Sequence, residues 1–338
     1  MKKHVLLILP MLLLAACGPT NNPTSEPTVD PSVEPSVEPS VEPSVPALTV
    51  EFAPMHLYQD LPTLEIRPLF SDPSLAETEN FVYTLDDERV ATIEGNVVTY
   101  LNPGRSIVKC VSENFSTQFV LFTHEGFSTV GGPLKQPYID LKARYGSHTT
   151  KEDATIFIGD SFFQFWRDGT AGTLFSKDFA GKNAVNLGIN GTTTHHWRAM
   201  WRDYLADTIV SPKNFIVNIG INNVDDNSED GKNAGRNVRM LLEDIHETFP
   251  EAKIYYFSIT RCSKGTFATY WDRHNGANTY LKENFFVDNS YATYLDANEI
   301  FGEDYADYRM DDGLHINGRG YLIFKSLINE YVEIEDLE

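Results

Sequence analysis

The chain has little cysteine and a deficit of positive charge. Only 3 cysteines occur in 338 residues, which excludes the disulfide framework that holds small secreted domains together. Lysine and arginine number 27 against 48 acidic residues, so nothing in the composition suits a nucleic-acid backbone. The chain must therefore rely on an apolar core, and its length predicts two domains.

The N-terminus has an apolar run, at residues 5–16, that is too short to cross a bilayer of about 30 Å. It follows two lysines and ends in small residues before Cys17, which is typical of a secretory signal. The end of the run resembles a bacterial lipobox, which implies cleavage after residue 16 and a lipid on Cys17. We therefore expect an exported lipoprotein, held on the outer side of a bacterial membrane by this anchor only. The alternative is a secreted protein that loses Cys17 with its signal.

The other two cysteines, Cys110 and Cys262, fall in what we interpret as separate domains, so we expect buried thiols and no disulfide. Residues 17–46 are rich in proline, serine, valine and glutamate, with Pro-Ser-Val-Glu repeated at positions 31, 35 and 39. Regular proline favours an extended chain, which at about 3.1 Å per residue reaches roughly 90 Å. This segment is predicted to be a linker.

Residues 47–124 contain short β-type runs separated by turns, which favours a small all-β sandwich. The stretch from Thr84 to Gly104 resembles bacterial Ig-like domains, and that resemblance implies a spacer or adhesion module. Residues 125–153 are interpreted as a connector with a possible helix near 139–145. The predicted strands are Leu48–Phe52, Thr63–Ile66, Phe81–Thr84, Val90–Ile93, Val97–Tyr100, Ile107–Val111 and Thr117–Phe122.

From residue 154 to about 335, strand-like runs alternate with helical periodicity, which predicts an α/β fold with a parallel sheet. Ligands of such sheets bind beyond the carboxyl ends of the strands. The first of these runs ends in Gly159-Asp160-Ser161, where Ser161 is either part of a simple strand-to-helix turn or a nucleophile. The predicted strands are Ala154–Ile158, Ala184–Ile189, Phe215–Ile219, Ile254–Ile259 and Tyr291–Leu295.

A nucleophilic serine needs a base, and the base needs an orienting acid. Asp312 and His315 are three positions apart with a glycine between them, so on a turn the carboxylate can reach one imidazole nitrogen and leave the other free. Gly191 and Asn222 follow two other predicted strands. Together with the backbone N–H of Ser161 they would supply an oxyanion hole. Each fragment alone is explained by an ordinary turn, but their order at successive strand ends favours catalysis.

These four fragments match the sequence blocks of the SGNH (GDSL-type) hydrolases, over roughly residues 154–331. The resemblance implies a flavodoxin-like three-layer α/β/α fold and ester hydrolysis without a cofactor or metal. By position, Ser161 is the nucleophile, His315 the base and Asp312 its orienter, with Ser161, Gly191 and Asn222 in the oxyanion hole. Asn223 stands where the family usually has aspartate. The Gly-x-Ser-x-Gly elbow of α/β-hydrolases is absent, which argues against that fold.

Substrate contacts are less well indicated. Trp166, Trp197 and Asn223 are candidate substrate-binding residues, although helix-core packing is the commoner fate of tryptophan. His195 and His196 follow Gly191 and could line a cleft or lie in an exposed loop. No ligand-like spacing indicates a metal, since the calcium-type run at residues 226–231 has Asn237 where a glutamate is needed.

The predicted function is therefore that of a surface-anchored serine esterase. Its substrate is expected to be an ester, most plausibly an acetylated polysaccharide, on grounds of family analogy and location. A lipase or lysophospholipase is the enzymatic alternative. A non-catalytic glycan-binding lipoprotein is the alternative of another class. Activity should fall in acid as His315 is protonated, and a flat rate between pH 5 and 8 would argue against His315 as the base.

Overall fold

The computed structural model describes residues 47–129, 132–223, 226, 228, 230–287 and 289–337. The predicted signal, Cys17 and the linker lie outside the described residues. The described residues from 48 onward form one compact unit. Among the helices described, none is both long enough and apolar enough to span a membrane.

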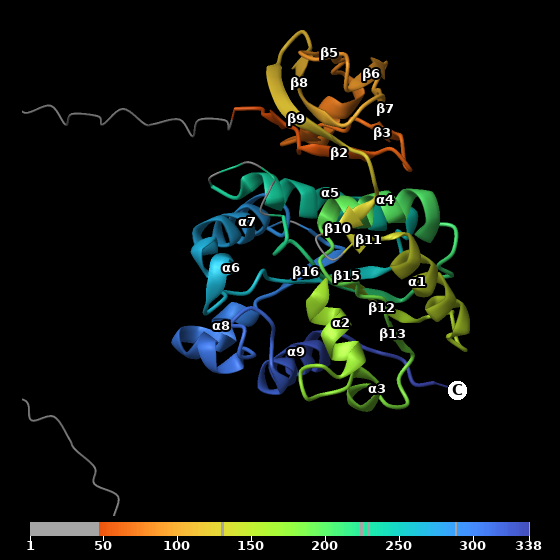
Figure 1. The fold of residues 1–338 in the computed structure, drawn as a ribbon, viewed down its shortest axis with the longest axis vertical. Helices are drawn as coiled ribbons and strands as arrows, with labels where there is room; N and C mark the ends of the chain where they lie inside the picture. Colours follow the sequence, from red (N-terminus) through yellow and green to blue (C-terminus); the bar gives the residue numbers. More distant parts are fainter. Residues whose placement is uncertain are drawn as a thin grey trace, which may run out of the picture. The chain divides into compact units, whose positions relative to one another are not determined.

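The N-terminal part of this unit is a β region, residues 48–124, drawn in orange and yellow in Figure 1. One sheet has the strand order β2-β9-β8-β5 and a second has the order β3-β7-β6, while β1 pairs with β4. Buried side chains of both sheets, such as Val98 and Val108, share one hydrophobic cluster. The bounds are β1 Val50–Glu51, β2 Met55–Tyr58, β3 Thr63–Glu65, β4 Leu69–Phe70, the 3₁₀ turn η1 Pro73–Glu77, β5 Val82–Leu85, β6 Ala91–Glu94, β7 Val97–Tyr100, β8 Gly104–Val111 and β9 Ser116–His124.

Each of the predicted β runs overlaps a strand, but the sequence analysis missed β2 and β4. All four residues of β2 are buried, so the alternation that identifies a half-buried strand is missing there. β2 pairs in parallel with β9 and forms an edge of its sheet. Cys110, on β8, and Cys262 are both buried free thiols, as predicted.

The remainder of the unit is an α/β domain built on a five-stranded parallel sheet of order β13-β12-β14-β15-β16. This is the strand order of a flavodoxin-like sheet, and the predicted fold class is confirmed. A short hairpin and helix α1 connect it to the β region, so the helix expected near residues 139–145 is also present. The strand bounds are β10 Ser128–Thr129, β11 Gly132–Pro133, β12 Thr155–Gly159, β13 Ala184–Asn186, β14 Asn214–Asn218, β15 Lys253–Phe257 and β16 Ala292–Leu295.

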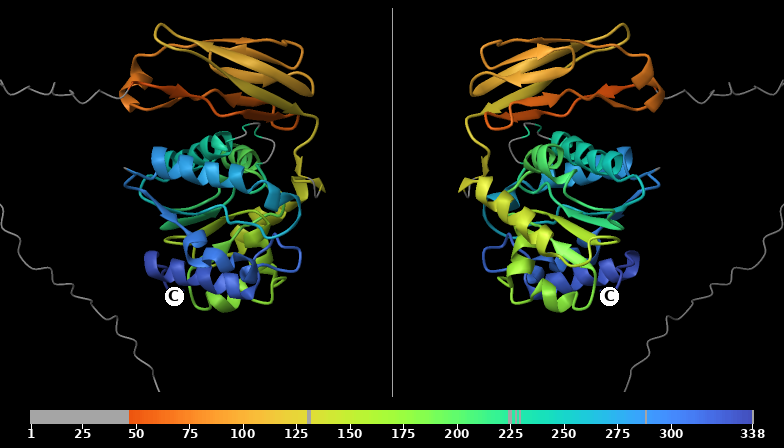
Figure 2. Two further views of the ribbon diagram at one scale, coloured as in Figure 1. Left: turned by 90° about the vertical axis from the view of Figure 1, so that its left-hand side faces the viewer. Right: turned by 90° about the vertical axis from the view of Figure 1, so that its right-hand side faces the viewer.

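Helices cover both faces of this sheet (Figures 1 and 2). Successive side chains of a strand point to opposite faces. Ile156 and Ile158 accordingly join the cluster with α1, α4, α5 and α7, whereas Phe157 joins the cluster with α2, α3, α8 and α9. The helices are α1 Lys135–Ser147, α2 Ser161–Asp168, α3 Phe175–Asp178, α4 Thr194–Met200, the π-helix η2 Trp201–Leu205, α5 Lys232–Thr248, α6 Gly265–Thr269, α7 Trp271–Asn284, α8 Ala297–Phe301, the 3₁₀ segment η3 Gly302–Tyr308 and α9 Gly318–Tyr331.

The β region contacts the α/β domain through α4, α5 and α7. Arg67 forms ion pairs with three acidic side chains of α5, among them Glu243 at 3.1 Å and Glu247 at 2.8 Å. Glu51 of β1 accepts hydrogen bonds from Arg236 of α5 and from the Tyr280 hydroxyl of α7. Polar contacts therefore link the two parts of the unit.

Candidate active site

Ser161 is the first residue of α2, directly beyond the carboxyl end of β12. Asp160 is the N-cap of this helix, and its Oδ1 accepts a hydrogen bond from the Phe162 backbone N–H at 3.0 Å. The cap turns the chain sharply from strand to helix and places Ser161, which is only 4% exposed, at the edge of the sheet. This motif therefore forms a strand-to-helix turn, and the same turn places Ser161 where a nucleophile would lie.

The Asp160 carboxyl is fully buried, and its Oδ2 has no hydrogen-bond partner within the described residues. Burial raises the pKa of Asp160 to about 7, against the lowering effect of its backbone hydrogen bonds. Burial therefore favours the protonated form of the carboxyl group one residue from Ser161.

His315 is held by a tight turn before α9. Asp312 Oδ1 accepts hydrogen bonds from the backbone N–H groups of Leu314, at 2.8 Å, and His315, at 2.9 Å. Gly313, which follows Asp312, has a φ of +71°. A Cβ atom at this position would lie 2.5 Å from the Lys264 Cβ. Only glycine fits both the left-handed backbone and this close approach, so the turn depends on residue 313.

The three side chains form one chain of hydrogen bonds. His315 Nδ1 lies 2.6 Å from Asp312 Oδ2, and His315 Nε2 lies 3.0 Å from Ser161 Oγ. Partial burial acts to raise the pKa of Asp312, but the hydrogen bonds from His315 and Leu314 lower it overall. Since an ionised carboxylate can only accept, Nδ1 carries the imidazole proton and Nε2 offers its lone pair to the serine hydroxyl.

The loop that carries Gly191 contacts the end of β12, since the Ile189 N–H and the Thr192 hydroxyl donate to the Gly159 carbonyl oxygen at 2.9 Å and 3.4 Å. Gly191 has a φ of +71°, and Asn222 donates a hydrogen bond from Nδ2 to the Thr192 carbonyl oxygen at 3.0 Å. Among the described residues, no hydrogen bond uses the backbone N–H of Ser161 or of Gly191. These two N–H groups and the second N–H of the Asn222 amide are available for an oxyanion.

Residues 157–323 match the model of the GDSL-like Lipase/Acylhydrolase family, and they include all the residues of this corner. This part of the chain belongs to that family. The GDSL-like domain is thus an ester-hydrolysing hydrolase. No curated protein matches the chain.

Solved structures resemble the GDSL-like domain at low identity. A GDSL-like lipase from Bacteroides thetaiotaomicron is 19% identical, with a TM-score of 0.44, and the match covers 57% of this chain and 95% of that one. The lipase/acylhydrolase from Enterococcus faecalis is 16% identical, with a TM-score of 0.37 and coverages of 55% and 99%. A mutant acetyl-xylooligosaccharide esterase from Geobacillus Stearmophilus is 16% identical, with a TM-score of 0.38 and coverages of 56% and 97%. Such scores carry no argument about substrate.

A cleft of about 650 Å³ borders the predicted oxyanion donors of the GDSL-like domain. Gly191 and Asn222 line it from the domain side, and Tyr58, His124 and Glu125 line it from the β region and the connector. Most of its lining side chains are polar, and Phe267 is its one phenylalanine. The β region therefore supplies part of the wall of this cleft.

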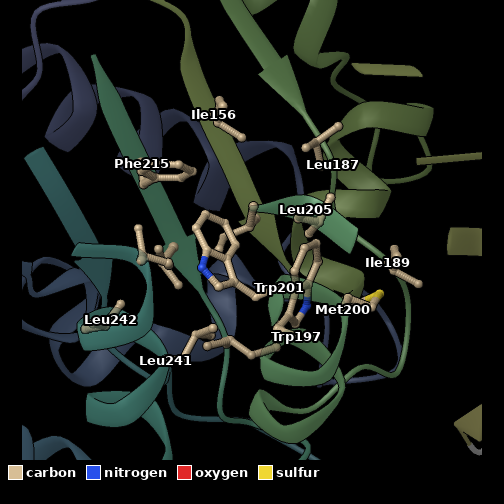
Figure 3. Packing of buried hydrophobic residues seen from close by; sticks show 14 of the residues in the cluster. Ile156, Leu187, Ile189, Trp197, Met200, Trp201, Leu205, Phe215, Leu241 and Leu242 are labelled. Atoms are coloured by element: carbon tan, nitrogen blue, oxygen red, sulfur yellow. The ribbon is translucent and has the colours of Figure 1, made fainter. Parts of the chain in front are cut away.

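The tryptophans expected to contact substrate do not. Trp166 and Trp197 are both 0% exposed, so this prediction was wrong. Trp166 packs on Phe175 and donates to Asp178 Oδ2 at 2.8 Å. Trp197 lies among Ile189, Met200 and Leu205 in Figure 3. Both rings are core residues because α2 and α4 turn these positions toward the sheet.

Asn223 lines the cleft, but its amide is engaged in the protein. Its Oδ1 accepts from the Thr194 N–H at 3.2 Å, and its Nδ2 donates to Thr194 Oγ1 at 2.5 Å and to Asp226 Oδ2 at 2.8 Å. The residue that replaces the family's aspartate thus joins two loops, and its role as a substrate ligand is not supported by this geometry.

His195 and His196 are buried and line the cleft, so the expectation of an exposed loop was wrong and that of a cleft wall is confirmed. The sequence analysis missed His56, which packs against them. His56 of β2 stacks on His195 of α4 with ring centroids 3.6 Å apart, and its Nδ1 lies 3.0 Å from His124 Nε2. Burial and the neighbouring imidazoles of His195, His124 and His196 lower the pKa of His56 well below its ordinary value. The signal was hidden because His56 and His195 are far apart in sequence and belong to different parts of the unit.

Proposed function

We propose that Ser161, His315 and Asp312 hydrolyse esters as a nucleophile, general base and orienting acid. The observation that carries this proposal is the continuous hydrogen-bond chain from Ser161 Oγ through both imidazole nitrogens to Asp312 Oδ2. A serine hydroxyl is a weak nucleophile unless a base within hydrogen-bonding distance takes its proton, and this arrangement supplies that base.

The reaction follows from the roles of these atoms. As Ser161 Oγ attacks the ester carbonyl carbon, its proton passes to His315 Nε2 and the carbonyl oxygen becomes an oxyanion. The N–H groups of Ser161 and Gly191 and the Asn222 amide stabilise that charge. His315 then protonates the leaving alcohol, and water, deprotonated by His315, releases the acid from Ser161 by the reverse path.

The proposed substrate is an acetylated polysaccharide. The cleft beside Gly191 and Asn222 presents hydroxyl, imidazole, amide and carboxylate side chains, which can form hydrogen bonds with the hydroxyl groups of sugar rings. A lipase would need an apolar channel for its acyl group. The described lining of this cleft has no leucine, isoleucine, valine or methionine side chain that could form one. The preference for a small acyl group follows from that difference.

We propose further that the enzyme is an exported lipoprotein, anchored through Cys17 and separated from the membrane by the proline-rich linker. The lipobox-like sequence and the linker composition support this placement. The β region is proposed to be an Ig-like module that both spaces the catalytic domain and contributes to its cleft.

The decisive experiment compares wild type with Ser161→Ala in the hydrolysis of p-nitrophenyl acetate. Wild type should turn over and the variant should lose at least about 1,000-fold in kcat with an unchanged circular dichroism spectrum. Equal rates would overturn the proposed nucleophile. Acetylated xylan, acetylated peptidoglycan and long-chain p-nitrophenyl esters then identify the substrate class, and a preference for the long chains would contradict the deacetylase proposal.

A further inference from the structure

The buried histidines belong to a cluster that also contains a carboxylate. His56 lies on β2, His195 lies in the first turn of α4, and Asp226 lies in the loop between β14 and α5. One atom from each, two imidazole nitrogens and one carboxylate oxygen, lie within 4.8 Å of one another. The three residues are at most 9% exposed. Imidazole nitrogen and carboxylate oxygen are both ligands of divalent metal ions.

The distances from the carboxylate oxygen to the two imidazole nitrogens are close to those between ligands of one metal ion. Asp226 Oδ1 lies 3.1 Å from His195 Nε2 and 3.7 Å from His56 Nε2. Ligands placed tetrahedrally at Zn–N and Zn–O distances of about 2.0–2.1 Å lie about 3.3 Å apart. The rings of His56 and His195 are stacked at an interplanar angle of 9°. For the Nε2 lone pairs of both rings to point at one ion, one ring must tilt.

Two of these atoms lack any other use. His56 Nε2 and Asp226 Oδ1 are buried and have no hydrogen-bond partner within the described residues, although His195 Nε2 approaches Asp226 Oδ1 to 3.1 Å. Buried polar atoms are nearly always satisfied, so unpartnered atoms that face one another indicate a missing partner. A cation would satisfy both.

The surroundings hold two of the three groups, His56 and Asp226, whereas His195 Nδ1 has no hydrogen-bond partner within the described residues. His56 Nδ1 lies 3.0 Å from His124 Nε2, and a proton on Nδ1 leaves the lone pair of Nε2 free to bind. Asp226 Oδ2 accepts hydrogen bonds from the amides of Asn223, at 2.8 Å, and Asn237, at 3.2 Å, which leaves Oδ1 directed at the histidines. Metal ligands are commonly held by such outer contacts.

We propose that His56 Nε2, His195 Nε2 and Asp226 Oδ1 bind a divalent transition-metal ion of the Zn²⁺ class. Two imidazoles and one carboxylate are ligands of intermediate softness, which suits Zn²⁺ better than Ca²⁺ or Mg²⁺. The imidazoles of His56 and His195 also line the cleft, so the ion can enter from it and a fourth ligand can come from water or substrate. The ion would clamp β2 of the β region to α4, just after the proposed oxyanion residue Gly191.

The test is metal binding itself and does not depend on esterase activity. Wild type, freed of metal with a chelator and titrated with ZnCl₂ in a calorimeter, should bind one equivalent, retain it through gel filtration and unfold at a higher temperature. His56→Phe keeps the stacked ring but removes the ligand atom, and Asp226→Asn keeps an acceptor for the two amides but removes the charge. Each should weaken Zn²⁺ binding by more than about 100-fold. His246→Phe is the matched control, because His246 stacks on Tyr291 away from the cluster.

A chain that retains no stoichiometric Zn²⁺ overturns the proposal, as does binding that both ligand variants keep. If the ligand variants fail to fold, Co²⁺ bound to wild type gives the answer. Intense visible absorption from four-coordinate Co²⁺ supports the site, whereas the pale spectrum of the hydrated ion contradicts it.

Discussion

Ser161 Oγ lies 3.0 Å from His315 Nε2, although 154 positions of sequence separate the two residues. β12 delivers the serine at its carboxyl end, and the turn before α9 delivers the histidine to the same edge of the sheet. The ring of Phe165 lies 4.3 Å from the imidazole, centroid to centroid, and supports it from one side. The pair therefore has the geometry for proton transfer before any substrate binds.

Asp312→Asn should separate the orienting role of the carboxylate from its structural role. Asparagine can still accept from the backbone N–H groups of Leu314 and His315, so the melting temperature should change little. It cannot stabilise the imidazolium or hold the same tautomer, and kcat for p-nitrophenyl acetate should fall by about four orders of magnitude. A loss smaller than tenfold would remove Asp312 from the proposed mechanism.

Asn222→Ala tests the oxyanion hole. Removal of one such donor should lower kcat by about 100- to 1,000-fold and leave KM nearly unchanged, because the charge develops only in the transition state. The matched control is Asn190→Ala, which truncates an exposed amide in the same loop as Gly191. If KM rises and kcat is unchanged, Asn222 binds ground-state substrate instead.

Trp166→Ala should act on stability and not on substrate affinity. The ring is fully buried between α2, α3 and α9, stacks on Tyr321 and donates to Asp178. Chemical denaturation should show a loss of about 3–5 kcal/mol in the free energy of unfolding. Trp271→Ala, at a partly exposed position, should cost clearly less. Equal costs for the two variants would contradict the packing described for Trp166.

Asp160→Asn should alter how stability depends on pH. Burial raises the pKa of Asp160 to about 7 in the folded protein, whereas the unfolded value is 3.8. Between these values the folded state holds the proton and the unfolded state does not, so this group makes stability fall as pH rises from about 4 to about 7. Below pH 4 both states are protonated and the effect is absent.

Asparagine caps a helix as well as aspartate does and has no charge to bury. The variant should therefore gain on the order of a few kcal/mol over wild type by pH 8 and little at pH 4, as read from thermal melts of both proteins across this range. A difference that is constant with pH would show that Asp160 does not titrate there. Because both proteins share all other titrating groups, the comparison isolates this one.

The strand ends and turns that carry the candidate site could be predicted from the sequence. Gly159-Asp160-Ser161 follows a continuous β run, and the glycine between Asp312 and His315 marks a turn, so both sides of the catalytic corner could be predicted. A parallel sheet then brings the strand ends together, because the carboxyl ends of its strands share one edge. Local pattern and topology were sufficient for this corner.

Features that depend on contacts between distant segments could not be predicted in the same way. Trp166 comes shortly after Ser161 in the sequence, and Trp197 comes shortly after Gly191. The helical period of 3.6 residues nevertheless turns both tryptophans toward the core. β2 does not alternate between buried and exposed residues, because all four of its residues are buried. The cluster of His56, His195 and Asp226 exists only through the packing of β2 against α4, which no spacing in the sequence encodes.

The most direct test of the account is the covalent labelling of the nucleophile. The protein is treated with a fluorophosphonate ester, which reacts with a serine only when a base activates it, and the modified peptide is found by mass spectrometry. The account predicts one adduct, on Ser161, that is lost in Ser161→Ala and strongly slowed in His315→Ala. Labelling at another residue, or unchanged labelling of Ser161 in the His315 variant, would contradict it.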